Sequence, residues 1–172
     1  PWAMNHNGHI ANANLNSHAE CLACQTLKGQ VNVPGGTIAE NDHWTADHCL
    51  GPYGLGSVVV KSKVHRENLW QLTAAESASL GRFMAALSEA IAKALAAERV
   101  YVSLWVDQLP YHVHFVLQPR YPGKQELGLK GLELQVFRSL SPPSREAEMA
   151  DAARRIRTYL QEKTRGRVEC ES

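Results

Sequence analysis

The sequence predicts an α+β domain built on an antiparallel sheet. A helical periodicity covers residues 73–98, and two strand-like runs, 99–107 and 111–119, follow it directly. Further strand-like runs precede this helix, and a helical run at 141–163 closes the chain. Strands and helices that are grouped in this way are typical of α+β folds with an antiparallel sheet, a long helix and a C-terminal helix.

Length and composition fit one domain. The 172 residues are 44% apolar and 20% charged, which suits a globular chain with a single hydrophobic core. We expect residues 1–17, which are rich in Asn, to form a flexible N-terminal tail. Residues 18–172 then form the domain, and its last part, about 121–172, is a C-terminal helical extension.

Charge and cysteine content narrow the function classes. The formal net charge is +1, so no strong field predicts a nucleic-acid or membrane partner. No apolar run approaches the roughly 20 residues that span a bilayer, and the first residues do not resemble a secretory signal. The four cysteines, two of them in a CxxC, fit metal or redox chemistry better than a disulfide framework. We therefore expect a cytoplasmic protein.

The first third of the chain alternates short runs and turns. The segment CLACQTLKG, 21–29, fits a short helical turn, and VPGG then breaks the chain. Residues 36–49 hold two short strand-like runs that can pair as a hairpin. A glycine-rich loop at 50–56 leads to the β-branched run 57–65, which predicts the third strand.

The helix at 73–98 has a clear start and a single apolar face. Thr73, with Glu76 three residues later, forms a capping box that satisfies backbone N–H groups at the first turn. Apolar residues then recur at spacings of three and four: Leu80, Phe83, Met84, Leu87, Ile91 and Leu95. In the closing helix, the inner face is predicted to carry Met149, Ala152, Ile156 and Leu160, with a cap at or near Ser144.

The last predicted strand carries two histidines on one face. Because side chains alternate along a strand, His112, His114, Val116 and Gln118 point to one side of the sheet. The apolar residues between them point to the other side.

The CxxC formed by Cys21 and Cys24 has the spacing of two thiolates that chelate one tetrahedral ion. Two sets of histidines can complete such a site. His43 and His48 lie at a zinc-finger spacing, but the gap from Cys24 is long for a finger. His65 and His112 come from separate strands. The remaining histidines, His6, His9 and His18, fall in or beside the predicted tail.

Taken together, these features resemble the histidine triad (HIT) superfamily. The resemblance rests on CxxC, a strand that runs into KSKVH, then ENLWQLTAAE with a long helix, and finally HVHFVLQPR, over roughly residues 21–120. Within this superfamily, the chain is similar to the zinc-binding branch and to the related galactose-1-phosphate uridylyltransferases. The family fold is an α+β domain that usually dimerises through a helix and a strand, so the resemblance implies a homodimer.

The resemblance also implies roles for individual residues. His114, the middle motif histidine, would attack the α-phosphorus of a nucleotide or nucleotide conjugate and form a nucleotidyl-histidine intermediate. The zinc ligands would be Cys21, Cys24, His65 and His112, and four protein ligands make the zinc structural. Gln108 matches a glutamine that is common in the family, and Gln108 and Arg120 are the expected substrate-binding residues.

One position departs from the family pattern. Val116 occupies the place of the third motif histidine and has no hydrogen-bonding group to offer. Gln118 lies on the same face but roughly 13 Å along the strand from His114, too far for a direct replacement. Phosphoryl chemistry needs charge stabilisation, for which the neighbouring cations in sequence are Lys61, Lys63, Arg66 and Arg120.

Three functions therefore compete. The first is a nucleotide hydrolase or nucleotidyltransferase that acts through His114. The second is a catalytically weak or inactive nucleotide-binding or regulatory protein, because Val116 removes one transition-state contact, a loss that commonly costs about a hundred- to a thousandfold in rate. The third is an α+β domain with a structural zinc whose strand histidines have no further role.

Overall fold

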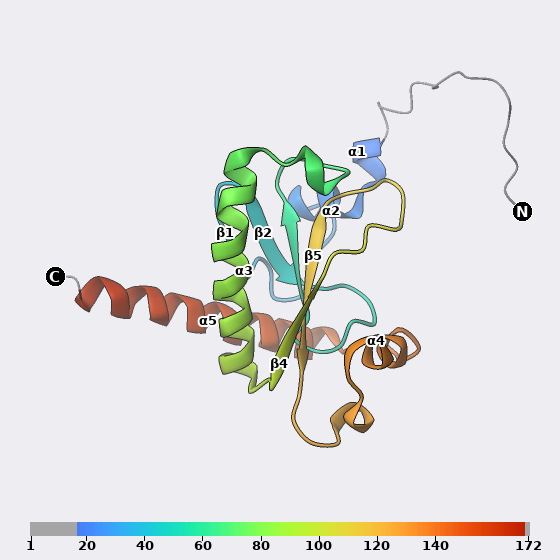
Figure 1. Ribbon diagram of the computed structural model, residues 1–172, viewed down its shortest axis with the longest axis vertical. Helices are drawn as coiled ribbons and strands as arrows, with labels where there is room; N and C mark the ends of the chain where they lie inside the picture. The colour runs from blue at the N-terminus through green and yellow to red at the C-terminus, as the bar shows by residue number, and fades with distance from the viewer. Residues whose placement is uncertain (1–16, 171–172) are drawn as a thin grey trace, which may run out of the picture.

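A five-stranded antiparallel sheet forms the centre of the molecule (Figure 1). The computed structural model describes residues 17–170, with side chains from 19 to 166. The strands lie in the order β1-β2-β3-β5-β4. Their bounds are β1 Ala39–Glu40, β2 Trp44–His48, β3 Val58–Ser62, β4 Arg99–Ser103 and β5 His114–Arg120. The predicted fold class is therefore confirmed. Residues 1–16 of the expected tail, with His6 and His9, and the side chain of His18 lie outside what the structure describes.

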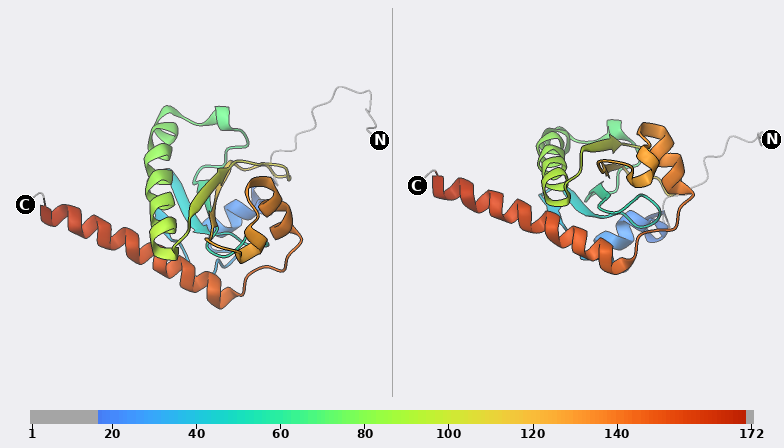
Figure 2. Two further views of the ribbon diagram at one scale, coloured as in Figure 1. Left: turned by 60° about the horizontal axis from the view of Figure 1, so that its bottom comes forward. Right: turned by 90° about the horizontal axis from the view of Figure 1, so that it is seen from below.

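Two long helices cover one face of the sheet. Helices α3, Ala74–Leu95, and α5, Glu146–Cys170, pack against each other and against the central strands (Figure 2). The capping box of Thr73 and Glu76 is present, and the apolar stripe of α3 faces inward as its periodicity predicts. The core joins these helices to Val113, just before β5, and to the strand residues Trp44, Ala46, Val58, Val60, Phe115 and Leu117.

Shorter elements cover the opposite face. They are α1, Ser17–Glu20, α2, Leu22–Leu27, α4, Gly131–Ser139, and the irregular segments that precede β3 and β5. Two short 3₁₀ turns, Leu69–Gln71 and Gln125–Gly128, lie in the connections. No described helix combines the length and the hydropathy that crossing a membrane requires.

Helix α4 lies within the expected C-terminal helical extension, although the sequence did not predict it as a separate helix. It is anchored by Leu134 and by the buried Arg138, whose guanidinium donates to the carbonyl of Pro119 at 2.7 Å and pairs with Glu126 at 2.6 Å. Gly54 packs against the same guanidinium with φ of +88°, and a Cβ there would lie 2.5 Å from Nε of Arg138. The helix is therefore held by one apolar side chain and by the polar contacts of Arg138, and local periodicity does not reveal such contacts with distant residues.

The strands around the motif are shorter than the sequence suggests. β4 ends at Ser103 and β5 begins at His114, so residues 104–113 are irregular. The backbone N–H of Val113 donates to the carbonyl of Arg66 at 2.6 Å, beyond the end of β3, instead of continuing the regular ladder. The closing helix starts at Glu146, in agreement with the cap predicted at or near Ser144, and Pro142 and Pro143 disfavour helical backbone at the residues before them. Its C-terminal half projects past the sheet (Figure 2).

Candidate functional site

Four side chains from three parts of the chain meet in one cluster. Cys21, Cys24, His65 and His112 each place one donor atom within 4.8 Å of all the others. Cys21 is the N-cap residue at the start of α2, and Cys24 lies within this helix. His65 follows β3, and His112 precedes β5. The cluster therefore connects the N-terminal segment to the end of the sheet.

The distances inside the cluster fit one tetrahedral metal ion. Nδ1 of His112 lies 3.3 Å from Sγ of Cys21 and 3.6 Å from Sγ of Cys24, and Nδ1 of His65 lies 3.3 Å from Sγ of Cys24. With Zn–S bonds of about 2.3 Å and Zn–N bonds of about 2.05 Å, the S···N edge of a tetrahedron is about 3.6 Å. Two soft thiolates and two imidazoles are also a donor set that zinc prefers.

The surroundings of His112 prepare it as a ligand. Its Nε2 lies 2.9 Å from the carbonyl oxygen of Ser62, which can only accept, so Nε2 carries the proton and Nδ1 presents its lone pair to the sulfurs. Burial lowers the pKa of His112 to about 4, against the opposing effect of the bond to Ser62. The imidazole is therefore neutral at pH 7 and able to bind a cation.

Burial acts in the opposite sense on the pKa of the Cys24 thiol. It raises the pKa of Cys24 to about 11, and the hydrogen bond between the Cys24 thiol and Cys21 adds to this effect. A bound cation reverses that preference, because metal ions bind the thiolate and displace the proton. Metal binding at this cluster should therefore release protons.

The alternative ligand pair lies elsewhere. Nδ1 of His48 donates to the carbonyl of Cys49 at 2.8 Å, and its Nε2 accepts from the backbone N–H of Gly56 at 2.9 Å. Both ring nitrogens are thus used by the loop that follows β2, and burial lowers the pKa of His48. His43 does not join the cluster either. Among the described residues, the finger-like arrangement is not formed.

A pocket of about 570 Å³ lies beside the cluster, on the sheet face that α3 and α5 leave open. Its floor includes Lys61 of β3 and the β5 residues His114, Val116 and Gln118. Its walls come from the segment around α2, the loop before β3, residues 105–110 and helix α4. Cys21 and His112 line it as well, so the cluster and the pocket share a wall.

His114 is oriented within this pocket by the backbone. Its Nδ1 lies 2.8 Å from the carbonyl oxygen of His112, so Nδ1 carries the proton and donates it. In the neutral ring, Nε2 then holds the lone pair. His114 is half-buried and lines the pocket, so this nitrogen is available to a ligand there.

Comparisons with known proteins agree with this architecture. The structure is similar to a zinc-bound histidine triad family protein from Mycobacterium smegmatis (TM-score 0.66, 17% identity, 87% of this chain and 99% of that chain covered). It is similar to a hypothetical histidine triad nucleotide-binding protein from Sulfolobus tokodaii (TM-score 0.66, 20% identity, 83% of this chain and 93% of that chain covered). It also matches a uridylyltransferase (TM-score 0.60, 25% identity), of which it covers 46% with 84% of its own length.

This chain has the histidine triad fold. The resemblance found in the sequence is therefore confirmed at the level of fold. No sequence model of a protein family matches the chain. A search of curated proteins also finds no match.

The histidine triad fold allows the remaining candidates to be placed. Gln108 lines the pocket together with His114. Val116 is 8% exposed, lines the same pocket and lies opposite Ser103 in the register of β4 and β5. The amide of Gln118 donates to the carbonyl of Tyr53 at 3.3 Å and to Gln135 of α4, so it binds the pocket wall rather than His114.

The structure does not bring Arg120 to His114. Arg120 ends β5, six residues or roughly 20 Å further along the strand, and pairs with Glu98 at 2.8 Å. Lys63 pairs with Glu40 at 2.8 Å, and Arg66 pairs with Glu76 at 3.2 Å; neither lines the pocket. Of the cations considered from sequence, Lys61 alone lies on its floor.

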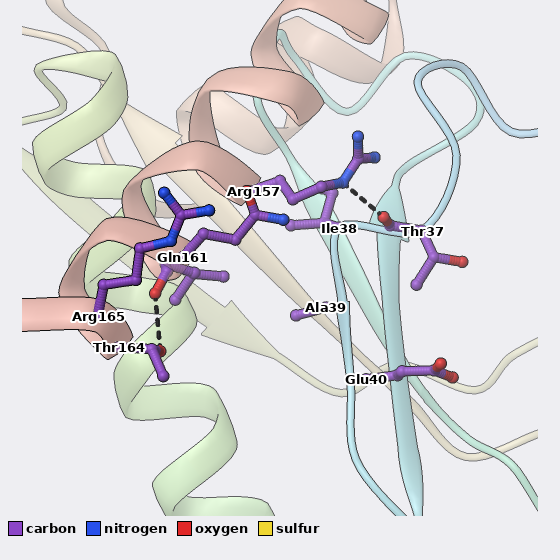
Figure 3. A pocket seen from close by; sticks show the side chains of 9 residues that line it. Thr37, Ile38, Ala39, Glu40, Arg157, Gln161, Thr164 and Arg165 are labelled. Carbon is purple, nitrogen blue, oxygen red and sulfur yellow. Dashed lines mark hydrogen bonds between the residues drawn. The ribbon is translucent and has the colours of Figure 1, made fainter. Parts of the chain in front are cut away.

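A larger cavity, of about 840 Å³, lies between the edge strand β1 and the projecting part of α5 (Figure 3). Arg157 spans it and donates to the carbonyl of Thr37 at 2.9 Å. Neither a cysteine nor a histidine lines this cavity, and its cations lie along an open surface. The chemistry-bearing residues are therefore in the smaller pocket.

Proposed function

We propose that the chain is a zinc-containing nucleotide hydrolase or nucleotidyltransferase that acts at the α-phosphate through His114. The observation that carries this proposal is the hydrogen bond from Nδ1 of His114 to the carbonyl of His112, which leaves Nε2 as the nucleophilic nitrogen in the pocket. The similarity to a nucleotide-binding protein and to a uridylyltransferase supports it.

In the proposed reaction, the lone pair of Nε2 forms a bond to the α-phosphorus, and the bond from phosphorus to the leaving oxygen breaks. The leaving group takes the electron pair of that bond. For hydrolysis, water attacks the phosphorus and releases a proton to solvent; for transfer, a phosphate oxygen of a second substrate attacks instead. In both cases the bond to Nε2 breaks, and Nε2 recovers its electron pair. The carbonyl of His112 stabilises the positive charge that the ring carries as the N–P bond forms.

We propose zinc as the resident metal, held by Cys21, Cys24, His65 and His112. Four protein ligands leave no open position, so the ion would stabilise structure and fix His112 rather than activate water. Because His114 bonds to the backbone of His112, fixing His112 also fixes the nucleophile.

Labelling at the α-phosphate tests the proposed chemistry. Wild type, His114→Ala and His43→Ala are incubated with α-³²P-labelled dinucleoside polyphosphates, nucleoside phosphoramidates and sugar nucleotides. We expect a protein-bound label, acid-labile as N–P bonds are, in wild type and His43→Ala and its loss in His114→Ala. Equal labelling of His114→Ala would contradict the assignment of the nucleophile.

A second function is favoured by one specific observation. Val116 places a side chain without a hydrogen-bonding group next to His114 on the pocket floor, which fits a nucleotide-binding protein with weak or no catalysis. Tight mononucleotide binding together with neither turnover nor labelling would support this function over the first.

We further propose a homodimer in a reducing compartment, the cytoplasm. β4 lies at the sheet edge and exposes Val102 at 48%, which suits pairing with a second copy. The described cysteines Cys21, Cys24 and Cys49 are all free thiols, and thiols that bind a metal must stay reduced. Light scattering during gel filtration would test the dimer, and a monomeric mass would refute it.

A further inference from the structure

Lys61 is a buried cation on the sheet face that carries His114. Its side chain is 3% exposed, and its ammonium bonds to the carboxylate of Asp47 and to the hydroxyl of Thr26. It nevertheless lines the pocket. Among the described residues that line this pocket, Lys61 is the single lysine or arginine.

The sheet register places Lys61 directly across from His114. The neighbouring pair, Ser62 and Val113, carries the bond from Ser62 N–H to the Val113 carbonyl. Because hydrogen-bonded and non-hydrogen-bonded pairs alternate in an antiparallel ladder, Lys61 and His114 form a non-hydrogen-bonded pair, in which side chains lie closest. Their Cβ atoms are then about 4.5–5.5 Å apart, and both side chains face the pocket.

The ammonium group is held from two sides and retains a donor. Asp47 comes from β2 and Thr26 from α2, so the two bonds fix the position of Nζ between the sheet and the N-terminal segment. A lysine ammonium has three N–H groups. The bonds to Asp47 and Thr26 use two of them, which leaves the third for a ligand in the pocket that Lys61 lines.

We propose that Lys61 donates a hydrogen bond to a non-bridging oxygen of the phosphate that His114 attacks. Lys61 thereby stabilises negative charge in the transition state, a role that Val116, with no donor, does not fill. This inference rests on the proposed function. The lysine forms no covalent bond and keeps its proton, while the bond changes occur between the phosphorus, Nε2 of His114 and the leaving oxygen.

The test must separate charge from stability, because Lys61→Met alone leaves Asp47 buried without its partner. We therefore compare Asp47→Asn, which retains the lysine charge, with the double variant Lys61→Met/Asp47→Asn, in which both charges are gone. Lys63→Met is the matched control, since it removes another ion-paired lysine two residues further along the chain and outside the pocket.

Two readouts are measured: the rate of ³²P labelling in a single turnover, and the equilibrium binding of AMP and UMP against adenosine and uridine. We expect the double variant to label roughly 100-fold more slowly than Asp47→Asn and to bind AMP or UMP about tenfold more weakly. Nucleoside binding and zinc content should be equal in these two variants, and Lys63→Met should match wild type.

The outcomes separate this inference from the proposed function. Equal labelling and equal mononucleotide binding in Asp47→Asn and the double variant would overturn the role of Lys61 and leave His114 untouched. If wild type binds AMP or UMP without becoming labelled, the assignment of His114 as the nucleophile is wrong. The difference in mononucleotide binding between Asp47→Asn and the double variant then supports or overturns Lys61 as the phosphate contact. If wild type binds none of these mononucleotides, both proposals are wrong.

Discussion

Removal of one histidine from the cluster should release zinc and, with it, a defined share of the stability. The proposed ligands join a segment at 21–24 to residues 65 and 112, so they converge only in the folded chain. An ion that binds the folded state alone stabilises it by about 4 kcal/mol when its free concentration is a thousandfold above Kd. For a chain of this size, 1 kcal/mol shifts Tm by about 2–4 °C. We therefore expect a zinc-dependent shift of roughly 8–16 °C.

The assay compares wild type, His65→Ala, His112→Ala and His43→Ala. Metal content is measured by mass spectrometry of the purified proteins, and Tm is recorded with zinc and after a strong chelator. Wild type and His43→Ala should hold one zinc per chain and show the shift. His65→Ala and His112→Ala should hold none and should not respond to the chelator.

The four cluster residues are not part of the hydrophobic core between the sheet and the two long helices. For that reason we expect both metal-free variants to remain folded, with faster hydrogen exchange confined mainly to residues 17–27. Zinc that is retained in His65→Ala and His112→Ala, or lost in His43→Ala, would refute the assignment of the ligands.

Three further predictions follow from single positions. Val116→His should raise the single-turnover labelling rate by about tenfold or more, because it adds a donor beside His114; a rate no higher than that of Val116→Leu would contradict this. Burial lowers the pKa of His48 in the folded state, so the neutral ring stabilises the fold fully above the unfolded pKa of about 6.5, and this stabilisation declines as pH falls. His48→Gln should therefore lose less stability than wild type between pH 7 and pH 5. If the free energy of unfolding in urea changes with pH equally in wild type and His48→Gln, this prediction is wrong. Gly54→Ala should cost about 1–3 kcal/mol, since φ is +88° and Arg138 occupies the space; an unchanged urea midpoint would refute that.

The sequence predicted those parts of the fold that depend on local pattern. Thr73 and Glu76 define the start of α3 through their own hydrogen bonds, and the apolar stripe that follows needs no knowledge of distant residues. The four cysteine and histidine residues were named through the family resemblance, and the structure brings them together.

The remaining features depend on contacts between distant residues. Helix α4 is held by Arg138 against Glu126 and the carbonyl of Pro119, which no local periodicity reveals. Arg120 was grouped with His114 because the two are close in sequence. They lie at opposite ends of β5, however, roughly 20 Å apart along the extended strand. Lys61 was one of four cations considered from the sequence, and only the sheet register and its bonds to Asp47 and Thr26 distinguish it from the others.

In the proposed reaction, His114 forms a covalent bond to the α-phosphorus. This bond is tested most directly by trapping wild-type protein during reaction with the labelling substrates at alkaline pH, where N–P bonds persist, and mapping the modified peptide by mass spectrometry. We expect one nucleoside monophosphate group on His114, within residues 111–120. A modification on another residue, or turnover with no covalent adduct on any histidine, would contradict it.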